Sequence, residues 1–269
     1  MTPVLWVVQT NLGDPATPDA IKSACERNGL LFRGVAVRPF ADDLPEIEHD
    51  GPVLAYGAAR FIKNVAASER WRPGAFFDPH SFTVTNCLRA WQRWMVNHDS
   101  VVVRLADVAS LPHRAGDELF VRPDGDLKEF AGDLMTFQAL CDWAAKVAGG
   151  GFEIDGALRV AVAKPKTIKS EWRVFAVEGP RVIAATRYRV GGRLAPNADV
   201  PQEVIAFVEA RLREWMPAPA VALDVAETGN EIRVLELTDI HSAGFYAADV
   251  EAVVVETSRV ATHHWRPWR

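Results

Sequence analysis

The sequence predicts an α/β protein whose C-terminal part has α+β character, and three observations lead to this fold class. Over about the first 105 residues, short apolar runs alternate with helical stretches, which is typical of a parallel sheet. After residue 158, strand-like runs follow one another. The 269 residues, 49% hydrophobic and 24% charged, are enough for one large or two modest globular units. We predict an α/β domain over residues 1–105, a smaller unit over 106–157 and a larger one over 158–269.

The N-terminal segment begins with an apolar strand at residues 4–9. A helix is expected over 18–28, where Gly29 provides the usual C-terminal stop. Further strands are expected at 35–37 and 53–56, a second helix after Gly57 and a third over 83–97. This order of elements predicts a parallel sheet with crossover helices.

The rest of the chain is read in the same way. A strand at 119–122 leads into the loop DGDLKEFAG, and a helix is expected over 134–147. Strands at 158–163, 171–177 and 182–190 precede a helix over 201–215. Two more strands and a helix over 248–262 complete the chain.

Charge and cysteine content limit the partners and the cellular location that we expect. The net charge of −5 argues against nucleic acid as the main partner. The three cysteines show neither metal-ligand spacing nor a disulfide framework, so we expect a reducing, cytoplasmic location. No apolar run approaches the ~20 residues that span a bilayer, so no membrane partner is expected. The oligomeric state does not follow from the sequence, and a homodimer is among the states compatible with it.

Two late strands, within residues 221–246, each carry a carboxylate among apolar neighbours: Asp224 and Glu236. A carboxylate inside an apolar run is costly to bury unless something pairs with it. Two of them are suited to a hard cation, Mg²⁺. If the intervening loop has an odd number of residues, both lie on one sheet face, one diagonal step apart. The alternative is two carboxylates on the solvated face of an ordinary hairpin.

A second hairpin contains the segment SEWRVF. Alternation places Glu171 and Arg173 on one strand face. If Gly179 and Pro180 form a two-residue turn, Thr186 and Tyr188 share that face, and the patch suits an anionic group. The alternative is a surface sheet face with a local ion pair, which contributes little to stability.

Two loops carry further candidates. Arg122 ends a strand, and Lys128 follows within the glycine-bearing loop, an arrangement that suits phosphate oxygens. The alternative is a solvated loop with incidental charges. Asp239 and His241 follow the last predicted strand, where loops often carry function, although a loop histidine is more often structural than catalytic.

These motifs, taken in order, resemble those of the ATP-grasp superfamily, and most closely a divergent bacterial and phage group with unassigned substrates. A strand reading FVRP precedes the loop DLKEFAG. The segment SEWR comes next, followed by a strand with an arginine–tyrosine pair and then by a glutamate six residues before SAGFY. The resemblance covers the chain from about residue 100 onward. It implies an N-terminal α/β domain followed by a two-subdomain ATP-grasp fold.

The resemblance also implies roles for individual residues, with ATP and Mg²⁺ as cofactors. Arg122 and Lys128 would face the ATP phosphates, and backbone groups near residues 161–164 would hold the adenine. Arg173 would contact a phosphate or the acyl phosphate. Arg173 and Lys128 are the implied catalytic residues. The implied nucleotide-binding residues are Arg122, Lys128, Ala163, Lys164, Glu171, Arg173, Arg187 and Tyr188. The implied metal ligands are Asp224, Glu236 and Asp239.

The sequence departs from the family pattern at Thr238, where the metal strand commonly has asparagine. Threonine is a poorer cation ligand, so one metal would bind weakly or Asp239 would substitute. The function implied is an ATP- and Mg²⁺-dependent ligase that joins a carboxylate to an amine through an acyl phosphate. Its substrates, a small-molecule or peptide acid and an amine-type nucleophile, would bind near residues 56–63 and 78–86.

Two other functions stay open on the sequence. One is a nucleotide-binding regulator that keeps the fold without ligase activity, which Thr238 favours. The other is a scaffold whose tryptophans form a protein interface, since the chain has nine tryptophans and a tail reading HHWRPWR. Trp91 and Trp94, at helical spacing, are more often core residues than interface residues.

Overall fold

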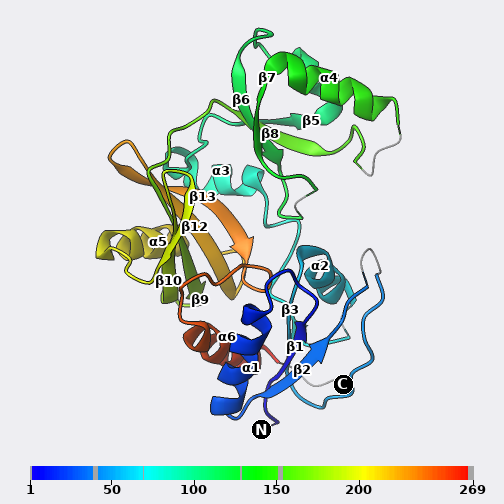
Figure 1. Ribbon diagram of the computed structural model, residues 1–269, viewed down its shortest axis with the longest axis vertical. Helices are drawn as coiled ribbons and strands as arrows, with labels where there is room; N and C mark the ends of the chain where they lie inside the picture. Colours follow the sequence, from blue (N-terminus) through cyan, green and yellow to red (C-terminus); the bar gives the residue numbers. More distant parts are fainter. Residues whose placement is uncertain (1, 39–41, 69, 128, 151–153, 266–269) are drawn as a thin grey trace.

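Three sheets lie one after another along the long axis of the molecule (Figure 1). The computed structural model describes residues 2–38, 42–68, 70–127, 129–150 and 154–265. A parallel four-stranded sheet forms one end, an antiparallel five-stranded sheet the middle and an antiparallel four-stranded sheet the other end. The predicted fold class is confirmed. Within the described residues, no helix has the length and apolarity needed to cross a membrane.

The N-terminal sheet has the order β2-β1-β3-β4. Its strands are β1 (Leu5–Gln9), β2 (Leu31–Val35), β3 (Val53–Tyr56) and β4 (Pro73–Gly74). Helices α1 (Ala16–Arg27) and α2 (Ala59–Ser68) connect them. Strands β1 and β3 are fully buried, whereas β2 forms an edge and leaves most side chains partly exposed. That edge position explains why the apolar pattern predicted its strand at 35–37 rather than 31–35.

The small sheet has the order β5-β8-β6-β7. It contains β5 (Val101–Arg104), β6 (Glu118–Pro123), β7 (Asp133–Thr136) and β8 (Arg159–Ala163), covered by α4 (Phe137–Ala148) and the 3-10 helix η2 (Leu105–Ser110). The helix predicted from residue 134 begins at Phe137, because residues 133–136 pair with β6 and Thr136 caps the helix. Strands β5 and β8 lie just outside the predicted range 106–157, since they carry the chain into and out of the sheet.

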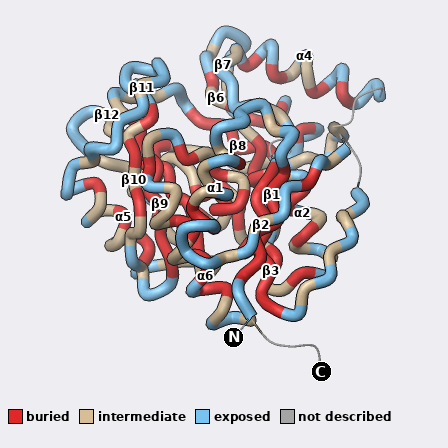
Figure 2. The backbone as a smooth tube through the Cα atoms, turned by 60° about the horizontal axis from the view of Figure 1, so that its bottom comes forward, coloured by how far each residue is buried: buried red, intermediate tan, exposed pale blue. Residues whose placement is uncertain are grey.

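The central sheet has the order β11-β10-β9-β12-β13. Its strands are β9 (Ser170–Val177), β10 (Arg181–Val190), β11 (Arg193–Asn197), β12 (Ala220–Thr228) and β13 (Glu231–Asp239). Helix α5 (Gln202–Glu214) packs on the face that carries Trp172 and Val174, and α6 (Val250–His264) packs on the face that carries Phe175. Buried residues fill β9, while the loops around β11 are exposed (Figure 2).

Helix α6 joins the central sheet to the N-terminal domain. It packs against α1, and the indole Nε1 of Trp6 in β1 donates to the hydroxyl of Ser258 at 2.9 Å. Both groups are buried. The two units therefore share one hydrophobic core cluster.

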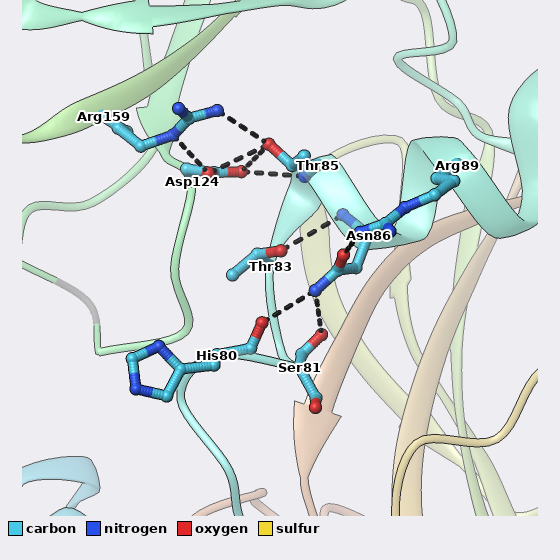
Figure 3. A network of polar contacts seen from close by, with 8 residues as sticks. All are labelled: His80, Ser81, Thr83, Thr85, Asn86, Arg89, Asp124 and Arg159. Carbon is cyan, nitrogen blue, oxygen red and sulfur yellow. Dashed lines mark hydrogen bonds and ion pairs between the residues drawn. The ribbon is translucent and has the colours of Figure 1, made fainter.

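Helix α3 (Val84–Trp91) and the 3-10 helix η1 (Gln92–Trp94) link the N-terminal domain to the small sheet. The buried carboxylate of Asp124, after β6, accepts hydrogen bonds from the backbone N–H of Thr85 at 2.8 Å and from its hydroxyl (Figure 3). It also pairs with Arg159 of β8 at 3.0 Å. The helix predicted over 83–97 ends early, at Gln92, which adopts a positive φ of 37°. We call this Asp124–Thr85–Arg159 group the α3 clamp.

Candidate functional site

A cleft of about 490 Å³ lies between the small sheet and the central sheet. One part of its wall is apolar and comes mainly from the small sheet and its loop, and the other part is charged. The lining residues are Phe120, Arg122, Pro123, Gly125, Phe130, Ala131, Gly132, Ile168, Glu171, Tyr188, Arg189, Leu235 and Glu236. The cleft thus brings together the three sequence segments that carried the predicted site.

An ion pair closes one side of this cleft. Arg122, near the end of β6, donates from Nη2 to Oε1 of Glu236 on β13. Both side chains are largely shielded from solvent, with 16% and 23% exposed. Burial disfavours the charged guanidinium, but the nearby Glu236 carboxylate outweighs this and raises the pKa of Arg122. A predicted phosphate-binding cation and a predicted metal ligand therefore neutralise each other across the two sheets.

A buried network continues from the cleft into the central sheet. Arg173 on β9 donates from Nε and Nη2 to the two carboxylate oxygens of Asp224 on β12, both at 2.8 Å. The hydroxyl of Tyr188 donates to Oε2 of Glu171 at 2.7 Å and lies 3.2 Å from Oδ2 of Asp224. Glu171 and Tyr188 line the cleft, whereas Arg173 and Asp224 join them through the tyrosine hydroxyl.

Burial and the charges in this network shift the pKa values of Tyr188 and Arg173. Burial raises the pKa of Tyr188, and the neighbouring carboxylates of Asp224 and Glu171 raise it further. For Arg173, burial opposes the charge, but Asp224 dominates and the pKa is raised. Tyr188 is therefore a neutral donor and Arg173 a permanent cation at physiological pH.

The face that these residues share results from turns and bulges acting together. The β12–β13 hairpin has a two-residue turn, Gly229 and Asn230, rather than the odd-numbered loop on which the prediction depended. An extra residue in β13, Leu235, shifts the register so that Glu236 pairs with Asp224. The expected diagonal step is thereby replaced by a direct cross-strand pair.

The β9–β10 hairpin behaves in the same way. Its connection has three residues, 178–180, instead of a two-residue turn. An extra residue at Ile183 places Thr186 opposite Arg173, on the face predicted for it, and Tyr188 forms a second bulge. Arg189 is thereby placed opposite Glu171 and lines the cleft.

The loop after β13 is a structural turn. Both oxygens of Asp239 accept hydrogen bonds from it: from the N–H groups of His241 and Ser242 at 2.8 and 3.0 Å, and from the Ser242 hydroxyl. The ring of His241 accepts from the N–H of Phe76 at 2.9 Å and contacts the carbonyl of Ala55 at 2.8 Å. Burial lowers the pKa of His241, so this histidine is neutral and ties β3 to the central sheet.

The other predicted site residues have different positions. Ala163 is buried and pairs with Phe120 of the cleft wall, while Lys164 is exposed and its N–H donates to Asp99. Arg187 pairs with Trp172 and leaves β10 on the opposite face from Thr186, away from the cleft lining. Lys128 lies outside the described residues. The nucleotide role of each of these residues stays a prediction.

Sequence reasoning missed several residues of the cleft. Arg189 was missed because the bulge that turns it toward Glu171 is invisible in an alternating pattern. Phe120, Phe130 and Ile168 were missed because single apolar residues around a loop resemble ordinary core. The signal that could have found Phe130 is the apolar content of its own loop segment, FAG, within an otherwise charged stretch.

The predicted metal ligands fit a divalent cation unequally. Glu236 lines the cleft and has a hard oxygen donor there, which fits Mg²⁺. Asp224 is 2% exposed and is engaged by Arg173, and the oxygens of Asp239 are engaged by its own loop. In the part of the chain that the structure describes, no group of three or more His, Cys, Asp or Glu side chains is arranged to hold a metal ion.

Comparison with known proteins defines first the fold and then the family. D-cycloserine synthetase DcsG aligns with a TM-score of 0.63 at 15% identity, over 97% of this chain and 100% of that one. D-alanine–D-alanine ligase from Bacillus anthracis aligns with a TM-score of 0.60 at 11% identity, over 98% and 100%. The ATP-grasp ligase PsnB, complexed with a precursor peptide and AMPPNP, gives 0.57 at 12%, over 98% and 99%. At these identities the likeness establishes an ATP-grasp fold.

The family follows from the sequence itself. Residues 52–257 match the family described as ATP-grasp domain, R-two-K clade family 3. The chain therefore belongs to this family, and the predicted resemblance is confirmed. No curated protein matches the chain.

Proposed function

We propose that this protein is an ATP- and Mg²⁺-dependent ligase that joins a carboxylate to an amine through an acyl-phosphate intermediate. The observation that carries the proposal is the cleft between the two antiparallel sheets, with one apolar and one charged wall. The apolar side, with Phe120, Phe130 and Ile168, suits a purine base. Arg122 and Arg189 suit phosphate oxygens, because guanidinium groups bind them with paired hydrogen bonds.

The residues present can support the two chemical steps. The γ-phosphoryl group would pass to the substrate carboxylate with ADP leaving, and the amine would then attack the acyl carbon, lose a proton and expel phosphate. Phosphoryl transfer needs positioning and charge neutralisation more than a protein nucleophile. Arg122 and Arg189 would bind the phosphates, and Glu236 would hold Mg²⁺, which supplies further neutralisation. Tyr188 holds its proton beside Glu171 and would act as a donor, because its raised pKa prevents it from acting as a base.

The structural neighbours support the ligase class. Three of them are named as ligases or a synthetase, and one was solved with a peptide and an ATP analogue. We infer that the acid is a small molecule or a peptide and that the nucleophile is an amine.

Calorimetric titration of the full chain with ATP, with and without Mg²⁺, tests the nucleotide site. We expect binding that strengthens with Mg²⁺, followed by ADP release when carboxylate and amine mixtures are added. Absence of ATP binding in both conditions would overturn the proposal.

One second candidate function is a nucleotide-binding regulator. It is favoured by the ion pair that neutralises Arg122 and Glu236, together with Thr238. ATP binding without ADP release over a broad panel of acids and amines would support it instead.

A further inference from the structure

The network behind the cleft wall leaves little room for a cation at Asp224. A carboxylate has about four acceptor positions. Arg173 occupies two of them through a fork of bonds at 2.8 Å, and Tyr188 lies within hydrogen-bond distance of a third, at 3.2 Å. Asp224 is only 2% exposed. One acceptor position is left, on a carboxylate that solvent hardly reaches, so a metal ion could bind both oxygens of Asp224 only by displacing the guanidinium.

Arg173 is itself held on several sides. It is 8% exposed, and its Nη1 donates to the carbonyl of Gly244 at 3.2 Å. Its guanidinium carbon lies 5.6 Å from the ring centroid of Tyr188 and 5.4 Å from that of Tyr246. Those two rings stack with centroids 4.9 Å apart and planes 10° apart. Moving Arg173 away would break these contacts and leave two buried charges unpaired, which is strongly unfavourable.

Among the described residues, no third carboxylate is arranged with Asp224 and Glu236 to hold a metal ion, and the oxygen that Thr238 adds on their face is a neutral hydroxyl. Thr238 shares the face of Asp224 and Glu236 and is 0% exposed, and its hydroxyl has no hydrogen-bond partner among the described residues. Asp239 alternates with Thr238 and so leaves the strand on the other face. Its oxygens are bonded to the following turn. A metal between Asp224 and Glu236 would therefore lack a third protein carboxylate.

Glu236 differs from Asp224 in both exposure and partner. It lines the cleft, and its partner Arg122 belongs to the other sheet. The phosphates of a nucleotide that enters between the sheets can bind Arg122, which frees the carboxylate of Glu236 to bind a cation. Asp224 cannot be separated from its partner in this way, because Arg173 and Asp224 lie on neighbouring strands of one sheet.

We propose that Arg173 is a built-in cation in place of a second divalent metal, so that the nucleotide cleft holds a single metal ion, on Glu236. This inference rests on the proposed nucleotide site. It assigns Arg173 a positioning role: it neutralises Asp224 and fixes, through Tyr188, the carboxylate of Glu171 at the cleft wall.

The test counts Mn²⁺ ions bound to the full chain with the non-hydrolysable analogue AMPPNP, by electron paramagnetic resonance of free Mn²⁺. Calorimetry of AMPPNP measures the nucleotide stoichiometry in parallel. The wild type should bind one Mn²⁺ per bound nucleotide. Two Mn²⁺ per nucleotide in the wild type would overturn the inference and leave the proposed function standing. No AMPPNP binding would overturn the proposed function and this inference with it.

Two variants test which residues hold the bound metal ion. Glu236→Gln should weaken Mn²⁺ binding by at least about tenfold. The double variant Arg173→Met with Asp224→Asn removes both buried charges, so it avoids an unpaired one, and should still bind one Mn²⁺ per nucleotide. Loss of a Mn²⁺ ion in that double variant, with nucleotide still bound, would contradict the inference.

Discussion

Asp224 and Glu236 lie directly opposite one another on β12 and β13, although the two-residue turn between these strands would by itself place them on opposite faces. The extra residue Leu235 changes the register by one and returns Glu236 to the face of Asp224. A single bulge therefore decides whether the carboxylate on β13 reaches the cleft or the core beneath it. The placement of Glu236 therefore depends on the turn and the bulge together.

The turn can be tested at Gly229, which adopts a positive φ of 63° in open space. Gly229→Ala should lower the free energy of unfolding by about 1–2 kcal/mol, because an L-residue is disfavoured in this region. Gly116→Ala is the matched control, since it also faces open space but lacks a positive φ. Equal stability of the two variants in urea denaturation would show that the turn tolerates a side chain and does not restrict the register.

Local alternation in the sequence accounts for only part of the site. It places Glu171 on one face of its strand, and Glu171 lines the cleft, whereas Tyr188 and Glu236 reach the cleft through bulges that the pattern does not show. Period-2 patterning reveals such faces because successive side chains of a strand point to opposite sides. Strands β1 and β3 were visible for a different reason, because each is a short continuous apolar run, as expected for a fully buried strand.

The remaining features depend on tertiary structure. The bulges at Ile183 and Leu235 cannot be seen in a pattern of apolar residues, so the number of turn residues was wrong for both hairpins. Edge strands β7 and β11 carry mostly exposed residues and therefore give no apolar signal. Arg122 and Glu236 are 114 residues apart in sequence and lie on different sheets, so only the assembled fold shows their pairing.

Glu236 gives a direct test of activity. Glu236→Gln should abolish ATP turnover and leave the fold intact, because the carboxylate is partly exposed and an amide can still accept from Arg122. ADP release and the thermal unfolding midpoint measure the two effects. Glu227→Gln, on the neighbouring strand but paired with the exposed Lys169, should retain turnover. An unchanged rate in Glu236→Gln would remove this residue from the metal site.

The α3 clamp should contribute to the stability of the junction between the domains. Asp124→Ala removes the acceptor for the backbone N–H and hydroxyl of Thr85, and we expect a loss of about 1–2 kcal/mol, as for other lost helix caps. Arg159→Met removes only a half-exposed partner and should cost less than about 1 kcal/mol. Chemical denaturation of both variants gives the comparison. A larger loss for Arg159→Met would show that the ion pair, rather than the cap, holds the helix.

The buried His241 should make stability depend on pH. Burial lowers its pKa below the unfolded value of 6.5, so below that pH the unfolded chain binds a proton that the folded protein excludes. Stability is therefore complete above pH 6.5 and falls below it, by up to about 1.4 kcal/mol per pH unit for this one group. Urea denaturation between pH 7.5 and 5 (~0.5-unit steps) should show a smaller slope in His241→Gln than in the wild type. The exposed His80 provides the control, and His80→Gln should keep the wild-type slope. Identical slopes in all three proteins would mean that the histidine accepts its proton without unfolding, despite the hydrogen bond that its ring accepts from Phe76.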